Sequence, residues 1–163
     1  MKRLTYLFAV LIAATTLIAC DDDYNAPQTT RAEFQTQYPN AVDVEWEWKR
    51  GRKYRVAEFK QNGVECEAWY TKSDEWILTE YKIRYSELPE AVRTSFEQGY
   101  GAQTPVDSVY RIERSKGDVY YTIECEVIVN GFYTDIYLTY SADGTLEREW
   151  VEVENDDYLY YWL

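Results

Sequence analysis

The chain has 163 residues, of which 29 are acidic and 17 are basic, and its formal net charge is −12 at pH 7. Such an acidic protein is a poor partner for nucleic acid and for anionic membrane surfaces, whereas a cationic patch on another protein would be attracted to it. The chain contains no histidine, which excludes Ser-His-Asp and Cys-His catalysis together with imidazole metal sites.

Residues 1–19 have the pattern of an export signal. Lys2 and Arg3 precede the apolar run Leu7–Ala14, and Leu17-Ile18-Ala19 stands directly before Cys20. The apolar run is too short for a membrane span. Small and aliphatic residues before a cysteine resemble the lipobox of bacterial lipoproteins, and by that resemblance Cys20 becomes the lipidated first residue of the mature chain. An ordinary cleaved signal is the alternative.

Residues 20–29 are predicted to form a flexible acidic tether, because they contain too few apolar residues to pack. The run Asp21-Asp22-Asp23 resembles the surface-export signal of lipoproteins in one group of Gram-negative bacteria. Three adjacent aspartates lack the spaced ligands and the turn-forming glycine of a calcium loop, so we expect no metal site here. Together these features predict an exported lipoprotein of the outer membrane, on its periplasmic or its surface-exposed side.

A helix followed by a strand is predicted at the start of the globular part. Thr30–Gln37 has a helical pattern with Phe34 and Tyr38 four residues apart, and Pro39 ends it. In the strand that follows, large apolar residues alternate with polar ones, a period of two that places them on one face. These apolar residues are Val42, Val44, Trp46 and Trp48.

Two Asn-Gly pairs predict tight hairpins, because Asn62-Gly63 and Asn130-Gly131 each supply the two positive-φ residues of a type I′ turn. Two-residue turns fix the register, and the register fixes which side chains lie under the helices bearing Phe34 and Phe96. A slip of one residue would bury Glu124 and Glu126, at a cost of several kcal/mol each if unpaired. The predicted core set is Phe59, Cys66, Ile123, Cys125, Val127, Ile136 and Leu138.

The same order of elements returns later in the chain, where Leu88-Pro89 begins a second helix. We therefore expect an α+β fold: a tandem repeat of a helix plus a four-stranded antiparallel sheet, with the helices packed on one sheet face and the other face open. The two repeats, about 30–83 and 86–154, are expected to form a single domain over 30–154. Residues 155–163 are so aromatic that they must dock somewhere or form an interaction tail.

The opposite sheet faces interleave aromatic and acidic residues. Tyr and Trp are enriched at interface hot spots, so this face is a candidate binding surface for a protein or a glycan. Cross-strand aromatic pairs that only stabilise an exposed sheet are the alternative. The candidate partner-binding residues are Tyr54, Glu67, Trp69, Tyr120, Glu124, Glu126, Tyr133, Asp135 and Tyr137.

Catalysis is not expected. Glu124 and Glu126 lie two apart on one strand, a spacing that a glycosidase could use. However, Glu45 with Glu47 and Glu65 with Glu67 repeat this pattern, which is typical of a solvated strand face. Cys66 and Cys125 fall on the predicted core faces, where thiols are inert. They are expected either as buried free thiols or as a disulfide, since an exported compartment permits pairing.

Several short motifs resemble the PepSY-like, beta-lactamase-inhibitor-like family of exported bacterial proteins over about residues 30–150. They are Tyr38-Pro39-Asn40-Ala41, Val44-Glu45-Trp46 and Leu88-Pro89-Glu90-Ala91-Val92. Gly99-Tyr100-Gly101-Ala102 departs from the first of them in the second copy. The resemblance implies tandem helix-plus-sheet units with an open sheet face, and in the inhibitor proteins that lend the name this face grips an enzyme.

The expected function is therefore a lipid-anchored, non-enzymatic binding module of the cell envelope, an inhibitor or regulator of an exported enzyme, that needs no cofactor. A carbohydrate-binding surface lipoprotein is the alternative. The lipid anchor is its only expected contact with the membrane, and nucleic acid is not an expected partner.

Overall fold

The computed structural model describes residues 25–49 and 51–151. Its elements are α1 (Gln28–Gln37), β1 (Ala41–Lys49), β2 (Tyr54–Gln61), β3 (Val64–Tyr70), β4 (Trp76–Ile83), η1 (Tyr85–Glu87), α2 (Glu90–Tyr100), β5 (Val106–Arg114), β6 (Val119–Val129), β7 (Phe132–Ser141) and β8 (Leu146–Val151). The predicted signal peptide, Cys20, the aspartate run and the aromatic segment 155–163 lie outside the described residues.

All eight strands form one antiparallel sheet in which each strand pairs with the next along the chain. The predicted fold class, a tandem repeat of a helix plus a four-stranded sheet, is therefore wrong. β4 is not an edge strand, because it pairs with β5: Leu78 lies opposite Arg114 at one end of the ladder, and Ile83 lies opposite Val109 at the other. The free donors and acceptors of an edge strand are open to such pairing, and the alternation of residues within a strand does not indicate whether that strand ends a sheet.

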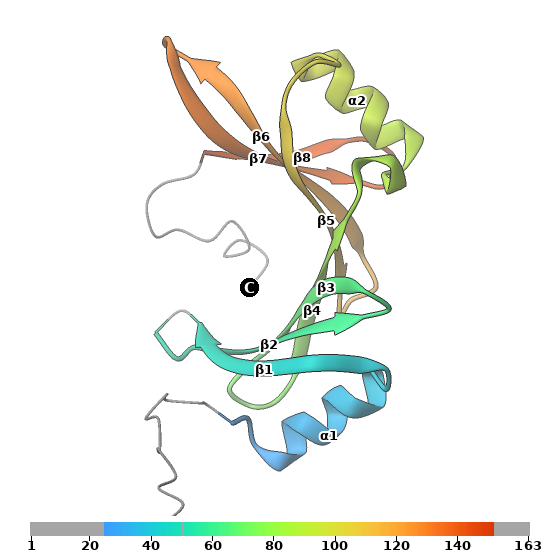
Figure 1. The fold of residues 1–163 in the computed structure, drawn as a ribbon, viewed down its shortest axis with the longest axis vertical. Helices are drawn as coiled ribbons and strands as arrows, with labels where there is room; N and C mark the ends of the chain where they lie inside the picture. Colours follow the sequence, from blue (N-terminus) through green and yellow to red (C-terminus); the bar gives the residue numbers. More distant parts are fainter. Residues whose placement is uncertain (1–24, 50, 152–163) are drawn as a thin grey trace, which may run out of the picture.

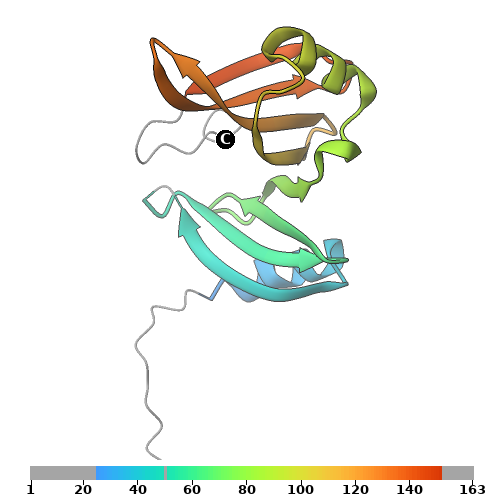
Figure 2. The same cartoon turned by 45° about the horizontal axis from the view of Figure 1, so that its top comes forward.

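The sheet bends into an arc, and both helices lie on its outer side (Figure 1). α1 lies beside β1 at one end of the arc, and α2 lies beside the strands at the other end; the rotated view keeps them apart (Figure 2). We call the side of the sheet that carries the helices the outer face and the opposite side the inner face. Strands β1–β4 with α1 form the first half of the molecule, and β5–β8 with α2 form the second half.

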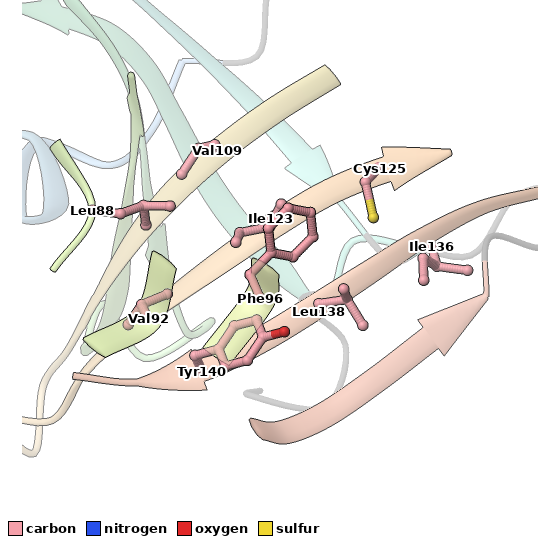
Figure 3. Close-up of a cluster of buried hydrophobic side chains, with 9 residues drawn as sticks. All are labelled: Leu88, Val92, Phe96, Val109, Ile123, Cys125, Ile136, Leu138 and Tyr140. Atoms are coloured by element: carbon pink, nitrogen blue, oxygen red, sulfur yellow. The ribbon is translucent and has the colours of Figure 1, made fainter. Parts of the chain in front are cut away.

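Each helix covers its own hydrophobic cluster on the outer face. Under α1, the Phe34 ring lies 4.9 Å from that of Phe59 and 5.4 Å from that of Trp46, centroid to centroid. Under α2, Val92 and Phe96 pack on the strands β5–β7, as the close-up shows (Figure 3). Of the predicted core set, Phe59, Cys66, Ile123, Cys125, Ile136 and Leu138 are buried and Val127 is partly buried, so the predicted hairpin register is confirmed.

A third cluster lies on the inner face, which the predicted fold class had left open. Because it fills the middle of that face, this part of the prediction is wrong as well. We call it the central cluster; its buried members are Tyr54, Val56, Trp69, Leu78 and Ile112, from β2, β3, β4 and β5. The alternation along these strands places apolar residues on both faces, as in a strand buried on both sides.

The two Asn-Gly turns form as the sequence predicts, but β1 departs from its predicted alternation. All four residues of the two Asn-Gly turns have positive φ, as a type I′ turn requires. In β1 the register shifts between Val42 and Glu45, and Asp43 has a φ of 53°. Such a bulge turns the strand, so Val42 and Val44 are exposed and do not share a buried face with Trp46, contrary to prediction.

Cys66 and Cys125 are buried free thiols, one in each of the two clusters under the helices. The alternative of a disulfide between them is not what the structure shows. Burial raises the pKa of each thiol to about 11, which keeps it protonated and unreactive at neutral pH. Within the described residues no helix is long and apolar enough to cross a membrane.

Candidate functional site

The inner face of the second half carries six of the predicted partner-binding residues. Tyr120, Glu124 and Glu126 alternate along β6, and Tyr133, Asp135 and Tyr137 alternate along β7. The register sets Glu124 opposite Tyr137 and Glu126 opposite Asp135, so these side chains point to the same side. The strands therefore assemble an aromatic and acidic surface.

Two tyrosines hold Glu124 in place on this surface. The Tyr137 hydroxyl donates to Oε1 of Glu124 at 3.1 Å, and the Tyr110 hydroxyl donates to Oε2 at 3.4 Å. Burial raises the pKa of Tyr110 to about 12, so it remains a donor over the physiological range. The carboxylate of Glu124 is thereby held in a fixed orientation on this surface.

The other three predicted residues lie on the inner face of the first half, where they are engaged within the molecule. Trp69 is fully buried and Tyr54 nearly so, both in the central cluster, where their ring centroids lie 6.2 Å apart. Glu67 accepts a hydrogen bond from Lys49 Nζ at 2.9 Å. The predicted residues thus share one face, but the structure separates them into a closed group and an open group.

Lys49 is the centre of a charge network that we call the lysine hub. Its Nζ lies 2.9 Å from Glu47, 3.3 Å from Glu58 and 2.9 Å from Glu67, and 5.3 Å from the centroid of the Trp69 ring. Burial lowers the pKa of Lys49, but the carboxylates, Glu67 foremost, outweigh it and leave the pKa raised. Burial and the neighbouring Glu58 raise the pKa of Glu47.

The end of the β6–β7 hairpin exposes a group of large apolar side chains, which we call the hairpin tip. Its members and their exposed fractions are Ile128 67%, Val129 45%, Phe132 74% and Tyr133 75%. In Figure 1 the hairpin extends past α2. Large exposed apolar groups gathered in one place mark interaction surfaces more often than scattered ones do.

Sequence reasoning found only Tyr133 of the hairpin tip, because Phe132 and Val129 alternate in register with core residues. A signal was available in the element lengths. Eleven helical residues in α2 span about 16 Å, whereas eleven strand residues in β6 span about 36 Å. A helix of that length leaves one end of the hairpin uncovered.

Two hollows adjoin these surfaces. One, of about 470 Å³, has a lining dominated by carboxylates, including Glu45, Glu65 and Glu80, with Lys60 and Lys82 at its side. The other, of about 450 Å³, lies between the end of α2 and the hairpin tip, where Tyr100, Ile128 and Tyr133 contribute to its wall. The first suits a cationic side chain, and the second suits an apolar one.

The chemistry available on the inner face is recognition. Each of the three glutamate pairs noted in the sequence has a member in a structural contact: tyrosines hold Glu124, and Lys49 holds Glu47 and Glu67. Glu45 and Glu65 line an open hollow. Among the described residues, no group of three or more Cys, Asp or Glu side chains is arranged to hold a metal ion.

Comparison with solved structures places this architecture among proteins of Bacteroides. A BLIP-like protein from Bacteroides fragilis is 27% identical, with a TM-score of 0.71 over 84% of this chain and 94% of that one. A DUF2874 family protein from Bacteroides uniformis is 22% identical, with a TM-score of 0.69 over 78% and 90%. A proposed periplasmic protein from Bacteroides eggerthii is 20% identical, with a TM-score of 0.70 over 78% and 90%. The last two show the fold alone.

A search of curated proteins finds no match to this chain. The family model for beta-lactamase-inhibitor-like, PepSY-like proteins matches residues 53–148, from the start of β2 into β8. This is an exported family with a non-catalytic, inhibitor-like fold. Because the match covers more than half of the sequence, the chain belongs to the beta-lactamase-inhibitor-like, PepSY-like family.

Proposed function

We propose that this protein is a lipid-anchored, non-enzymatic binding protein of the bacterial cell envelope, which holds a protein partner such as an exported enzyme. The binding surface consists of the hairpin tip and the inner face of β6 and β7 next to it. The observation that carries this proposal is the exposure of Ile128, Phe132 and Tyr133 together at the end of one fully paired hairpin.

The hairpin tip has no structural reason to be apolar. Its turn needs only Asn130-Gly131, and the strands on either side are already paired in register up to Val129 and Phe132. Exposed Phe and Ile residues favour association and aggregation. Contact with a partner would bury these residues and remove that risk. Aromatic anchors of this kind dominate the energy of protein interfaces.

The acidic residues beside the tip define the kind of partner. Glu126 and Asp135 lie opposite each other on the inner face, and Glu124 is fixed nearby by Tyr110 and Tyr137. Complementary charge raises association rates and selects among partners. We therefore expect a partner with a basic patch around an apolar pocket. Because Glu124 is already held in place, little of its side-chain entropy is lost on binding.

The envelope location rests on the export pattern of residues 1–19 and on Cys20 behind it. Its test is fractionation. The wild type is expected with the membranes and a Cys20→Ala variant in the soluble envelope fraction, and equal distribution of the two would contradict the lipid anchor.

Affinity capture from envelope extracts tests the binding function. The bait pair is the wild type and a Phe132→Ser/Tyr133→Ser variant, and the matched control is Val42→Ser/Leu146→Ser. The control removes two apolar residues that are 56% and 42% exposed but lie away from the tip. A protein captured by the wild type and by the control, and lost from the tip variant, supports the proposal.

The same three proteins applied to a glycan array separate the second possibility. Glycan binding without a captured protein would establish carbohydrate as the ligand and overturn the protein-binding proposal. Capture that is unaffected by the tip substitutions would also contradict it, because the hairpin tip would then not be the contact.

A further inference from the structure

The end of β6 has an open edge on its β5 side. β6 runs to Val129, whereas β5 begins at Val106, which lies opposite Cys125. Beyond that pair, one backbone hydrogen bond reaches β6 from this side, from the N–H of Glu126 to the carbonyl oxygen of Pro105 at 3.3 Å. In the part of the chain that the structure describes, the last residues of β6 therefore pair with β7 alone.

Two features of β5 end its pairing at this point. The register shifts between Val106 and Ser108, so Asp107 is an extra residue that bends β5. Pro105 comes just before β5 and has no N–H to donate to β6. The carbonyl oxygen of Glu126 therefore lacks the bond that an amide at position 105 would give it.

Ile128 directs its backbone groups toward the open edge. In a hairpin with a two-residue turn, the residues that flank the turn, here Val129 and Phe132, form a hydrogen-bonded pair, and bonded pairs then alternate with non-bonded ones. Ile128 and Tyr133 are the next pair and are non-bonded, so the N–H and C=O of Ile128 point away from β7. The N–H of Glu126, two residues earlier, donates toward β5, which agrees with this alternation. No described residue of β5 lies opposite Ile128.

A hollow of about 450 Å³ adjoins this edge. Its wall includes Thr104 and Pro105, which precede β5, and Val127 and Ile128 of β6. Val127 and Ile128 are consecutive and belong to opposite faces of the sheet. A hollow that touches both of them and the residues before β5 lies beside the strand, in the place that a longer β5 would occupy.

We infer that an extended segment of the partner protein adds a strand at this edge, with its backbone paired to Ile128. The inference rests on the proposed function, because it specifies how the partner meets the hairpin tip. Unpaired main-chain groups supply the hydrogen bonds of an added strand, and neighbouring pockets select its side chains. In the wall of the hollow, Tyr100 and Tyr133 favour an apolar residue, and the carboxylate of Glu126 favours a Lys or Arg close to it.

The edge of β1 shows how the same chain protects a strand from such pairing. Proteins defend edge strands with bulges and with charged residues. β1, at one end of the sheet, has a bulge at Asp43, and Glu45, Glu47 and Lys49 alternate along it. The end of β6 has neither defence, since Val127–Val129 are apolar and continue the ladder with β7 without a shift. This part of β6 is therefore suited to pairing with another chain.

Amide hydrogen exchange tests the open edge without a partner, on the chain after signal removal with Cys20→Ser. The amide of Ile128 should exchange at least about 10-fold faster than that of Val127, which faces β7 in a bonded pair with Thr134. Slow exchange at Ile128 would overturn the inference, because the edge would already be occupied. Protection lost on dilution would identify a second copy as the occupant, and protection that persists would identify the chain itself.

Selection from a library of random displayed peptides tests the added strand. The baits are the wild type, Ile128→Pro and Ile128→Val. Proline removes the N–H at this position and is tolerated where an edge N–H faces solvent, whereas valine keeps the N–H and a branched side chain. Peptides selected on the wild type should contain an apolar residue close to a Lys or Arg. They should bind Ile128→Val nearly as well and lose about 10-fold in affinity for Ile128→Pro, the effect of one lost hydrogen bond.

A second comparison does not depend on the folding of Ile128→Pro. Each selected peptide is resynthesised with one backbone amide at a time N-methylated. Methylation of the amide that donates to Ile128 should weaken binding to the wild type about 10-fold, while methylation of the next amide, which points away, should have little effect. Bound peptide should also slow the exchange of the Ile128 amide.

Three results of the peptide experiments would overturn the inference. They are equal binding to the wild type and Ile128→Pro by a folded variant, N-methylation without effect at every position, and no peptide selected by the wild type. The proposed function has its own test, because affinity capture with Phe132→Ser/Tyr133→Ser leaves the backbone of Ile128 unchanged. Capture that depends on the tip, without any strand addition at Ile128, would refute this inference alone.

Discussion

In the first half of the molecule, the inner face is filled by the central cluster and by the lysine hub, where Lys49 pairs with three glutamates of the same face. In the second half, the inner face ends at the hairpin tip, where Tyr133 on that face and Phe132 on the outer face stand largely in solvent. One sheet thus supports a closed region and an open region. The difference shows how a single sheet can obtain its stability from one part of a face and keep another part available for contact.

The two halves also seat their helices differently. The carboxylate of Asp74, in the β3–β4 turn, accepts hydrogen bonds from Thr29 at 3.1 Å and Thr30 at 2.5 Å and pairs with Arg55, which ties the start of α1 to the sheet. In the corresponding β7–β8 turn, Gly144 lies directly against the backbone of α2. The first helix is held by hydrogen bonds and charge and the second by close approach, so each half can be destabilised by a substitution that spares the other.

Gly144→Ala should have the largest effect. A Cβ there would lie 2.6 Å from the carbonyl oxygen of Ala91, and the residue has a φ of +88°. Backbone strain and overpacking together should lower the free energy of unfolding by about 3 kcal/mol or more. The control is Gly63→Ala, with a φ of +80° but open space around the Cβ, which should lose about 1 kcal/mol. Denaturant unfolding measures both, and equal losses would show that α2 is not seated on Gly144.

Asp74→Ala should have the next largest effect, because it leaves Arg55 and the buried Thr30 hydroxyl without their shared acceptor. The expected loss is about 2 kcal/mol at pH 7. Hydrogen bonds from Thr30 and Thr29, together with Arg55, lower the pKa of Asp74 in the folded state. Its contribution is therefore complete above the unfolded pKa near 4 and is lost as the pH falls through the folded pKa.

Unfolding curves of the wild type and Asp74→Ala should accordingly converge on acidification. The matched control is Asp143→Ala, in the turn of the second half, where the carboxylate bonds only to Ser141 and Thr145 in its own turn. A smaller loss is expected there. An effect of Asp143→Ala as large as that of Asp74→Ala would remove the contrast between the two helix seats.

Lys49→Met should lower the stability by about 1 kcal/mol at pH 7, a value reduced by the partial exposure of the hub to solvent. The variant keeps the packing on Trp69 but leaves three carboxylates without their cation. Its deficit should shrink on acidification, since the pKa of Glu47 is already raised and protonation relieves the repulsion. In the wild type, the raised pKa of Lys49 contributes stability fully below about pH 10, and this is lost at higher pH.

Much of this fold could be predicted from the sequence because its signals are local. The two Asn-Gly turns fixed the hairpin registers, and the registers placed Cys66 and Cys125 under the helices. Three features could not be predicted in this way. The pairing of β4 with β5 depends on which strand edge is free, the bulge at Asp43 depends on one backbone angle, and the burial of Trp69 depends on side chains that four different strands bring together.

The candidate site shows the same limit. Alternation along β6 and β7 correctly grouped Tyr133, Asp135 and Tyr137 on one face, since a period of two is a property of the strand itself. It missed Phe132 and Ile128, because alternation identifies a face and does not indicate where its cover ends. The relative lengths of α2 and β6 contain that information, and they can be read from a sequence once the elements are assigned.

The central claim is that the hairpin tip serves binding and does not contribute to stability. It is tested most directly by measuring both the unfolding free energy and partner capture of one variant, Phe132→Ser/Tyr133→Ser. If the hairpin tip serves binding alone, the free energy of unfolding of this variant should stay within about 0.5 kcal/mol of the wild-type value, as for substitutions at other exposed positions. The partner captured by the wild type should at the same time be lost. A stability loss above about 1 kcal/mol with capture intact would show that the tip is part of the structural framework and would contradict the account.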